Sequence, residues 1–275
     1  MADGTSGWNG AVERISPSEG SPDTGWRAVV ICDHARNAQP PGIDLGLSDV
    51  EMARHIAFDP GARGTVVELA RRLRGPAVMS TFSRLVIDPN RGEDDPTLVM
   101  RLYDGTIIPG NRHVETAEIE ARLAAYHRPY HHALDAALDA VIAAGEVPLI
   151  VSIHSFTPQL RGRAPRPWQI GLLYDKDVRV AEPLYRVLED MGPGPDGSAP
   201  VIGDNEPYSG QLRGDCLWRH GTMRGIAHVL VEIRNDLIAT PADEIAWAAH
   251  LDRALRRALP PQTLGFLAPS EPLSV

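Results

Sequence analysis

One stretch near the middle of the chain, residues 148–158, constrains the fold more than any other. It reads PLIVSIHSFTP, a nearly continuous apolar run that closes with polar residues and a proline. Such a run is typical of a strand buried in a parallel sheet. Because open α/β sheets bind their ligands at the carboxyl ends of the strands, His154 lies where a ligand or a catalytic group is expected. A lone buried histidine is more often part of the core, so the interpretation depends on what else reaches this edge.

Two other predicted strands end with residues of the same kind. Residues 26–33 (WRAVVICD) form the first predicted strand, which His34 follows directly. Residues 226–233 (IAHVLVEI) form the last predicted strand, with Glu232 near its end. Since the ends of parallel strands can be neighbours, we expect the two histidines and the carboxylate to lie close together. Imidazole and carboxylate groups at one edge favour a metal-dependent site over three separate core residues.

The rest of the chain alternates strands with helices. Ser48 and Thr240 are typical helix N-caps, and Pro129 is expected to divide a long helical segment. Residues 85–88 are predicted to form a short strand. This alternation predicts an α/β three-layer sandwich with a largely parallel mixed sheet.

Only the amino-terminal segment departs from this pattern. Residues 1–23 are rich in Gly, Ser, Pro and Asp, which predicts a mobile arm. No composition boundary divides the remainder, so residues 24–275 are predicted to form a single domain.

Composition limits the partners and the compartment. The formal net charge is −9 and no Lys/Arg-rich block occurs, which argues against nucleic acid as a partner. No apolar run approaches about 18 residues, so no membrane span is expected. Two cysteines without a C-x-x-C pair exclude a disulfide framework and a zinc knuckle built on cysteine pairs. The polar, acidic start is unlike a signal peptide, so we expect a cytoplasmic protein. With nucleic acid and membrane set aside, the expected partner is a small-molecule substrate.

The third ligand of a metal site is less obvious from the sequence. A catalytic zinc usually has three protein ligands and one water. Asn37 lies three residues after His34, where zinc hydrolases often carry a glutamate, but an amide is a neutral and weaker ligand. Asp49, His55 and Asp59 are alternatives. The last two are four residues apart and would share one helix face, which fits a surface ion pair as well as a ligand pair.

Glu232 is the candidate general base. Its neighbours along the strand are apolar, so its carboxylate is expected to leave the sheet beside the metal site, where it can accept a proton from water. The alternative is a buried ion pair with Arg234 or Arg224.

Two loop segments are candidates for substrate recognition. In residues 88–91 (DPNR), Arg91 can bind a carboxylate with two hydrogen bonds and Asn90 can add another. Arg84 offers a second guanidinium nearby. A turn with exposed charges explains the same residues. The other segment, residues 203–210 (GDNEPYSG), is rich in hydrogen-bonding groups; its candidate substrate-binding residues are Asn205 and Tyr208.

Taken together, these segments resemble the N-formylglutamate amidohydrolase family over about residues 29–237. The resemblance is carried, in this order, by CDHARN, RHIAFDPGA, SRLVIDPNR, SIHSFTP, IGDNEPYSG and HGTMRGIAHVLVEIRNDL. The family is similar to the zinc carboxypeptidases, so the resemblance implies a zinc-exopeptidase-like fold of the phosphorylase/hydrolase type, with zinc as the cofactor.

The resemblance also implies roles for individual residues. His34 and His154 would be zinc ligands and Glu232 the general base, while Asn90 and Arg91 would bind the substrate carboxylate. Where the carboxypeptidase motif H-x-x-E has its glutamate, this chain has an asparagine.

The resulting hypothesis is a metal-dependent amidohydrolase of amino-acid degradation that removes an N-acyl group from an acidic amino acid. In its most specific form, N-formyl-L-glutamate and water give glutamate and formate, and Arg84 stabilises the oxyanion. Two alternatives stay open: another carboxypeptidase-like or desuccinylase-like amide hydrolase, and a non-catalytic metal-binding or amino-acid-binding protein with the same fold.

Overall fold

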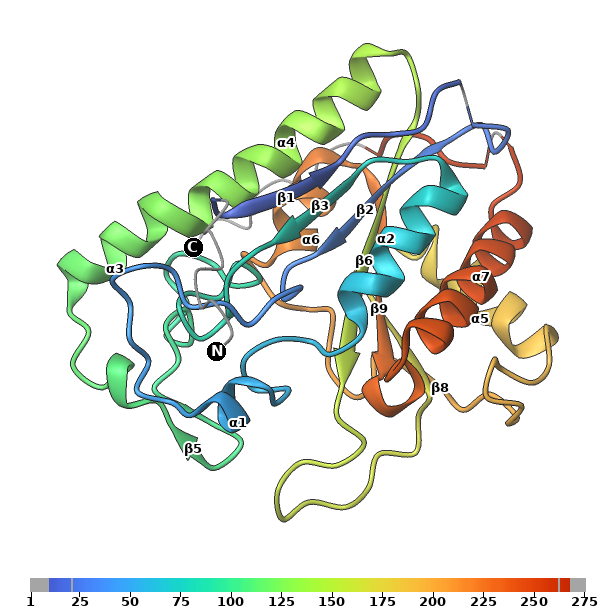
Figure 1. The fold of residues 1–275 in the computed structure, drawn as a ribbon. Helices are drawn as coiled ribbons and strands as arrows, with labels where there is room; N and C mark the ends of the chain where they lie inside the picture. The colour runs from blue at the N-terminus through green and yellow to red at the C-terminus, as the bar shows by residue number, and fades with distance from the viewer. Residues whose placement is uncertain (1–9, 21, 262, 268–275) are drawn as a thin grey trace, which may run out of the picture.

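A seven-stranded sheet organises the chain in the computed structural model, which describes residues 10–20, 22–261 and 263–267 (Figure 1). Its strands are β1 (Val12–Ile15), β2 (Arg27–Cys32), β3 (Ala77–Ser80), β6 (Pro148–Phe156), β7 (Ile170–Leu173), β8 (Ile202–Asp204) and β9 (Ala227–Arg234). A separate hairpin pairs β4 (Leu102–Tyr103) with β5 (Thr106–Ile107).

The strands lie in the order β1-β3-β2-β6-β9-β7-β8. The neighbours from β3 to β9 are parallel, as are β7 and β8, whereas β1 is antiparallel to β3 and β7 is antiparallel to β9. The predicted α/β class with a largely parallel mixed sheet is therefore confirmed. All nine residues of β6 are buried, which explains the nearly continuous apolar run in this part of the sequence.

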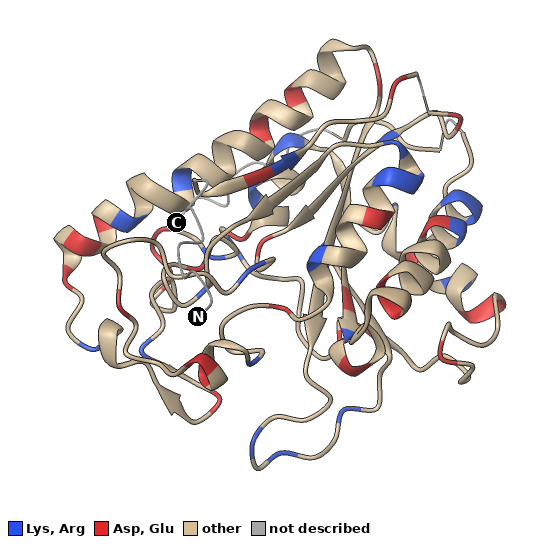
Figure 2. Ribbon diagram, in the orientation of Figure 1, with Lys and Arg blue, Asp and Glu red and all other residues tan. Residues whose placement is uncertain are grey.

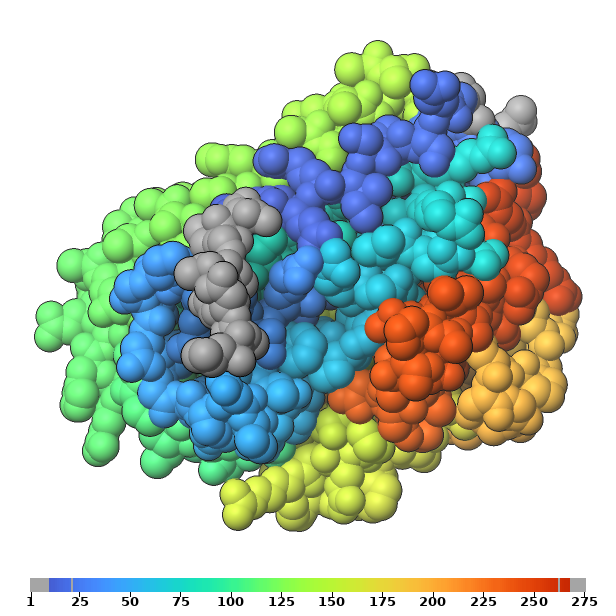
Figure 3. All heavy atoms as spheres, viewed as in Figure 1, coloured from blue at the N-terminus to red at the C-terminus, as the bar shows by residue number. Residues whose placement is uncertain are grey.

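Helices cover both faces of the sheet (Figure 1). They are α1 (Asp49–Met52), α2 (Ala62–Leu73), α3 (Thr116–Arg122), α4 (Arg128–Ala143), α5 (Ala181–Asp190), α6 (Cys216–His220) and α7 (Pro241–Ala258). Figure 3 shows α2 and α7 side by side over one face. Alternate residues of β6 divide between the faces: Val151 packs in the core with α2 and α7, and Ile150 packs in the core with α4 and α6.

Caps and prolines stand where the sequence predicts them. Ser48 and Thr240 each form a capping box with the residue three positions later. Pro129 lies in the first turn of α4, where it removes one backbone donor. The helical segment around it is continuous from α3 to α4 through one π-helical turn, Leu123–His127, and is not broken.

Two expectations about local structure need correction. Residues 12–15, inside the predicted arm, form the edge strand β1; its four-residue VERI pattern is too short to stand out in a polar segment. Residues 85–88, predicted as a strand, form a turn followed by an irregular segment. Their apolar side chains are buried in a separate core made by the irregular segments between residues 45 and 123, so burial without strand pairing explains the pattern. No described helix combines the length and apolar character that a membrane crossing requires.

Candidate metal centre and active site

The register of the central strands brings the predicted site residues together. β6 and β9 are parallel neighbours in which His154 stands directly opposite Glu232. Side chains at paired positions point to the same face of a sheet, here the face covered by α4 and α6, to which Ile150 and Leu230 also contribute. Asp33 and His34 follow immediately after β2, on the other side of β6.

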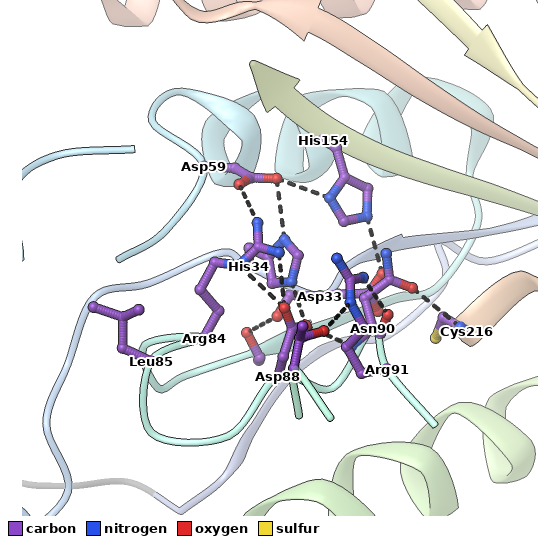
Figure 4. Close-up of polar contacts among 12 residues, drawn as sticks. Asp33, His34, Asp59, Arg84, Leu85, Asp88, Asn90, Arg91, His154 and Cys216 are labelled. Carbon is purple, nitrogen blue, oxygen red and sulfur yellow. Dashed lines mark hydrogen bonds and ion pairs between the residues drawn. The ribbon is translucent and has the colours of Figure 1, made fainter. Parts of the chain in front are cut away.

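His34, Asp59 and His154 form a buried cluster of potential metal ligands, with one ligand atom of each within 4.8 Å of the others. Asp59 Oδ2 lies 2.8 Å from His154 Nδ1 and 3.4 Å from His34 Nδ1 (Figure 4). The Asp59 backbone N–H donates to the His34 carbonyl at 2.9 Å, which brings the loop before α2 to the end of β2.

Each histidine of this cluster is held at its other nitrogen by a second carboxylate. His34 Nε2 lies 2.7 Å from Asp88 Oδ1, and His154 Nε2 lies 2.9 Å from Asp33 Oδ2. Carboxylates that hold the distal nitrogen are the usual support of metal-bound histidines, because they fix the tautomer and the orientation of the ring. The two Nδ1 atoms and the Asp59 carboxylate therefore fit a divalent metal ion.

The electrostatics of the cluster are those of a tightly paired site. Burial alone would raise the pKa of Asp59, but the two histidines outweigh burial and lower it. Burial would lower the pKa of His154, but its hydrogen bonds to Asp33 and Asp59 raise it well above the ordinary value. The pKa values of Asp33 and Asp88 are lowered as well, despite their burial, because of their histidine and arginine partners, so three ionised carboxylates surround the two imidazoles and favour a cation between them.

Glu232 lies beside this cluster without a partner of its own. Its side chain is buried, and among the described residues none forms a hydrogen bond with its Oε2. Burial raises the pKa of Glu232 to about 7. The proposed ion-pair alternative is not formed, because Arg234 pairs with Asp236 and Arg224 pairs with Asp135 and Asp139.

A cavity of about 120 Å³ opens onto these groups. Its lining includes all three members of the metal cluster, together with Glu232 and four further residues that the sequence predicts: Arg84, Asn90, Arg91 and Tyr208. The structure thus places these predicted residues around one space, in keeping with a site at the carboxyl edge of the sheet.

Arg84 is already engaged by carboxylates of the site. Its guanidinium donates twice to Asp88 Oδ2, at 2.7 and 3.1 Å, and its Nη1 lies 3.8 Å from Asp59 Oδ1. The guanidinium also lies over the Tyr103 ring, 5.3 Å from its centre. Arg84 therefore contributes a fixed positive charge next to the metal cluster.

Asn90 and Arg91 are held differently. Asn90 Oδ1 accepts a hydrogen bond from the Cys216 N–H at 3.1 Å (Figure 4). Arg91 donates from Nη1 to the Asn90 carbonyl at 2.7 Å and from Nε to Thr97 Oγ1 at 3.2 Å. No ion pair of Arg91 occurs in the described part of the chain, so its charge is available to an anion.

The structure favours Asp59 over the other candidates for the third ligand. Asn37 does not line the cavity, and its Nδ2 donates to the Met52 carbonyl at 2.8 Å. Asp49 is exposed in the first turn of α1. His55 lines the cavity but pairs with Asp104, at 3.2 Å. The third ligand predicted at Asn37 from its spacing is thus corrected. The Asn37 side chain is directed away from the histidines, and the carboxylate beside them belongs to Asp59, 25 residues after His34.

The two residues predicted in the loop after β8 also differ from each other. Asn205 is not part of the cavity lining; its Oδ1 accepts the backbone N–H groups of Tyr174 and Gly210, at 3.1 and 3.0 Å, and so holds the loop in shape. Its substrate-binding role is corrected to this structural one. Tyr208 does line the cavity, and its hydroxyl accepts from Arg166 at 3.2 Å.

Sequence reasoning gave no role to Asp33 and Asp88, the two carboxylates that hold the histidines. Each directly follows a buried apolar run, VVIC and LVI respectively. A carboxylate at the end of such a run requires a buried partner, and this signal was available in the sequence.

Comparisons with known proteins identify the family and the fold of the chain. The family model of N-formylglutamate amidohydrolase matches residues 26–239. A crystal structure of a gene product from Agrobacterium tumefaciens is 32% identical, with a TM-score of 0.81 over 91% of this chain and 95% of that chain. The N-formylglutamate amidohydrolase of Ralstonia eutropha JMP134, 21% identical over 90% of this chain and 99% of its own, shares the fold with a TM-score of 0.62. The comparison with curated proteins gave no match. Because the family model spans most of the sequence, the chain belongs to the N-formylglutamate amidohydrolase family.

Proposed function

We propose that the protein is a zinc-dependent amidohydrolase that cleaves an N-acyl group from an acidic amino acid, in the most specific case N-formyl-L-glutamate. The observation that carries this proposal is the unpartnered Glu232 carboxylate, which shares a cavity with the His34, Asp59 and His154 cluster. Membership of the family supports amide hydrolysis as the reaction.

The metal would be held by Nδ1 of His34, Nδ1 of His154 and the carboxylate of Asp59. Two nitrogens and one oxygen, with a position left open, form the ligand set of a catalytic zinc. The chemistry that zinc would supply there is polarisation of an amide carbonyl and a lowered pKa of a water molecule.

Glu232 has the position and the environment of a general base. It accepts a proton from the attacking water and then passes that proton to the leaving nitrogen. Its pKa of about 7 suits both steps, since a group poised near the working pH both takes up and releases a proton readily. Arg84, held by Asp88, supplies a fixed positive charge for the oxyanion.

Recognition of the acidic amino acid is assigned to Asn90 and Arg91. A guanidinium without an ionic partner binds a carboxylate through two charge-assisted bonds. The loop after β6 strengthens the attraction for anions, because all its charged residues are arginines: Arg161, Arg163 and Arg166 (Figure 2). These arginines are not part of the cavity lining, but Arg166 donates to the hydroxyl of Tyr208, which is, so the loop adds positive charge next to the site.

The direct test is formate release from N-formyl-L-glutamate by the purified protein, before and after removal of metal with a chelator and reloading with zinc. We expect activity that is lost on chelation and restored by zinc. N-formyl-L-glutamine is the matched substrate without the side-chain carboxylate, and N-succinyl-L-glutamate tests the desuccinylase alternative. If the zinc-loaded protein hydrolyses none of the three substrates, the proposal is wrong and the binding-protein alternative gains support.

A further inference from the structure

A second cluster of ionisable side chains lies between α4 and α6, outside the lining of the cavity. Its members are His131 on α4 and Cys216 and His220 on α6; all three are buried, and one potential ligand atom of each lies within 4.8 Å of the others. Cys216 and His220 are four residues apart, so they share one face of α6. We propose that these three side chains form a second metal site, suited to zinc, which fastens α6 to α4.

His220 is already held in the tautomer that a metal requires. Its Nδ1 lies 2.9 Å from Asp135 Oδ1, and its Nε2 lies 2.8 Å from His131 Nδ1. Because a carboxylate can only accept, the proton stands on Nδ1 and the lone pair of Nε2 points toward His131. This is the same carboxylate support that the histidines of the first cluster have.

A third imidazole, that of His127, lies against the His131 ring. Nδ1 of His127 is buried without a hydrogen-bond partner within the described ranges, whereas the Pro89 backbone is within hydrogen-bonding reach of the His131 ring. The two rings lie 4.4 Å apart between centroids. Because an imidazole gives a metal one nitrogen, the ligand atom of His131 would be Nδ1, which faces His220 Nε2. Burial lowers the pKa of the His127 and His131 imidazoles, which keeps them in the neutral form that binds metals.

The donor set indicates the metal. Zinc binds sulfur and imidazole nitrogen well, whereas hard cations such as magnesium prefer oxygen ligands. A set of one sulfur and two imidazole nitrogens therefore indicates zinc. Burial raises the pKa of the Cys216 thiol, so the thiol is protonated without metal; coordination would release this proton to solvent. Tetrahedral zinc with bonds of about 2.0–2.1 Å sets nitrogen ligands about 3.3 Å apart, so the His131–His220 pair would open by only about half an ångström.

This second site would adjoin the residues assigned to substrate recognition. The Cys216 N–H donates to Asn90 Oδ1 at 3.1 Å, and His127 Nε2 lies 3.0 Å from the Arg91 carbonyl oxygen. A metal that fixes α6 on α4 would therefore also fix the segment that carries Asn90 and Arg91. The proposal itself does not depend on the reaction that the first site catalyses.

Cobalt(II) chloride added to the metal-free protein tests the proposal without an activity measurement. Coordination by a thiolate produces a sulfur-to-cobalt charge-transfer band in the near ultraviolet, which the first cluster cannot give because it contains no cysteine. We expect the wild-type protein to show this band. The Cys216→Ser variant should lose the band and bind one cobalt fewer per chain, whereas the His34→Ala, His154→Ala double variant should keep the band.

Cys32 provides the matched control. It is buried on the opposite face of the sheet, in the core under α2 and α7, so Cys32→Ser should leave the band unchanged. Absence of the band from wild-type protein at saturating cobalt would overturn the proposal, and this measurement needs no variant to fold. A band that survives in Cys216→Ser and disappears in Cys32→Ser would overturn it as well.

Discussion

At the scale of single residues, the site depends on carboxylates that orient its histidines. Asp33 and Asp88 each take one nitrogen of a histidine, and the other nitrogen is left to face Asp59. A side chain fixed in this way loses little rotamer entropy when it binds a ligand, so the site is preorganised.

The identity of the third ligand leads to the first prediction. We expect Asp59→Asn to lower zinc content strongly, because it removes the charge between the two histidines. Asn37→Ala should leave zinc content near one equivalent for this site, since Asn37 bonds only to the Met52 carbonyl outside the cavity. Metal analysis of the dialysed variants measures both. If the Asn37→Ala variant loses its zinc and the Asp59→Asn variant keeps it, the third ligand is Asn37, as its spacing from His34 predicts.

Glu232 leads to a prediction that separates an enzyme from a binding protein. Glu232→Gln keeps the shape but cannot accept a proton, so we expect kcat to fall by roughly 10²–10⁴ with KM and zinc content nearly unchanged. Steady-state kinetics and metal analysis on one preparation measure this. Glu244→Gln is the control, because burial raises the pKa of Glu244 as well but that residue lies on α7, away from the cavity. If the Glu232→Gln variant has the kcat of the wild-type protein, Glu232 is not the general base and the proposed mechanism is wrong.

Arg91 tests recognition separately from chemistry. Arg91→Lys keeps the charge but loses the planar fork that binds a carboxylate with two bonds. We therefore expect a raised KM for N-formyl-L-glutamate and a smaller change in kcat. Kinetics with N-formyl-L-glutamine, which lacks one carboxylate, should be affected less. An equal loss for both substrates would assign Arg91 to some other role.

At the scale of elements, close backbone packing beside β9 keeps the base in place. Gly171 on β7 stands opposite Glu232 in an antiparallel pair. A Cβ at Gly171 would lie 2.1 Å from the Glu206 carbonyl oxygen, so the loop after β8 can approach β7 only because this residue has no side chain.

The corresponding prediction concerns stability. Gly171→Ala forces backbone atoms apart, and overpacking of this kind costs about 1–3 kcal/mol. We expect a lower melting temperature for this variant, measured by calorimetry. Gly265→Ala is the matched control, because a Cβ there meets no atom within 4 Å. Equal melting temperatures for the two variants would show that the contact at Gly171 relaxes without cost.

At the scale of the whole molecule, the site joins the sheet to the separate core of the irregular segments. The sheet supplies His154 and Glu232, while the irregular segments between residues 45 and 123 supply Asp59, Arg84 and Asp88. A metal ion held across these parts should bind the folded state only, since the ligands come from distant segments of the chain.

This arrangement predicts a metal-dependent melting temperature. Ligand at about 100 times its Kd stabilises a folded protein by about 2.7 kcal/mol, which for a chain of this size raises the melting temperature by roughly 5–10 °C. We expect zinc to produce such a shift in the chelated protein, and the His34→Ala, His154→Ala double variant to show a smaller one. A melting temperature of the wild-type protein that does not change with zinc would contradict the proposed centre.

Much of this organisation can be read from the sequence, because local patterns report local physics. A run such as LIVSI needs burial on both faces, and the polar residue that ends it must reach the edge of the sheet. This reasoning identified His34, His154 and Glu232, all of which line one cavity. The helix caps at Ser48 and Thr240 are equally local and were found in the same way.

Tertiary structure decided what depends on distance between segments. Asp59 completes the first cluster only because its loop returns to the end of β2, whereas Asn37, at the expected spacing, turns away. Asp33 acquired its role only when β6 brought His154 to it, and Asp88 only when its segment met His34 at the end of β2. The sequence by itself determined which residues are able to do the chemistry, because side-chain type and strand position are local. The fold alone decided which of them meet, because ligand geometry is set by packing among segments far apart in the chain.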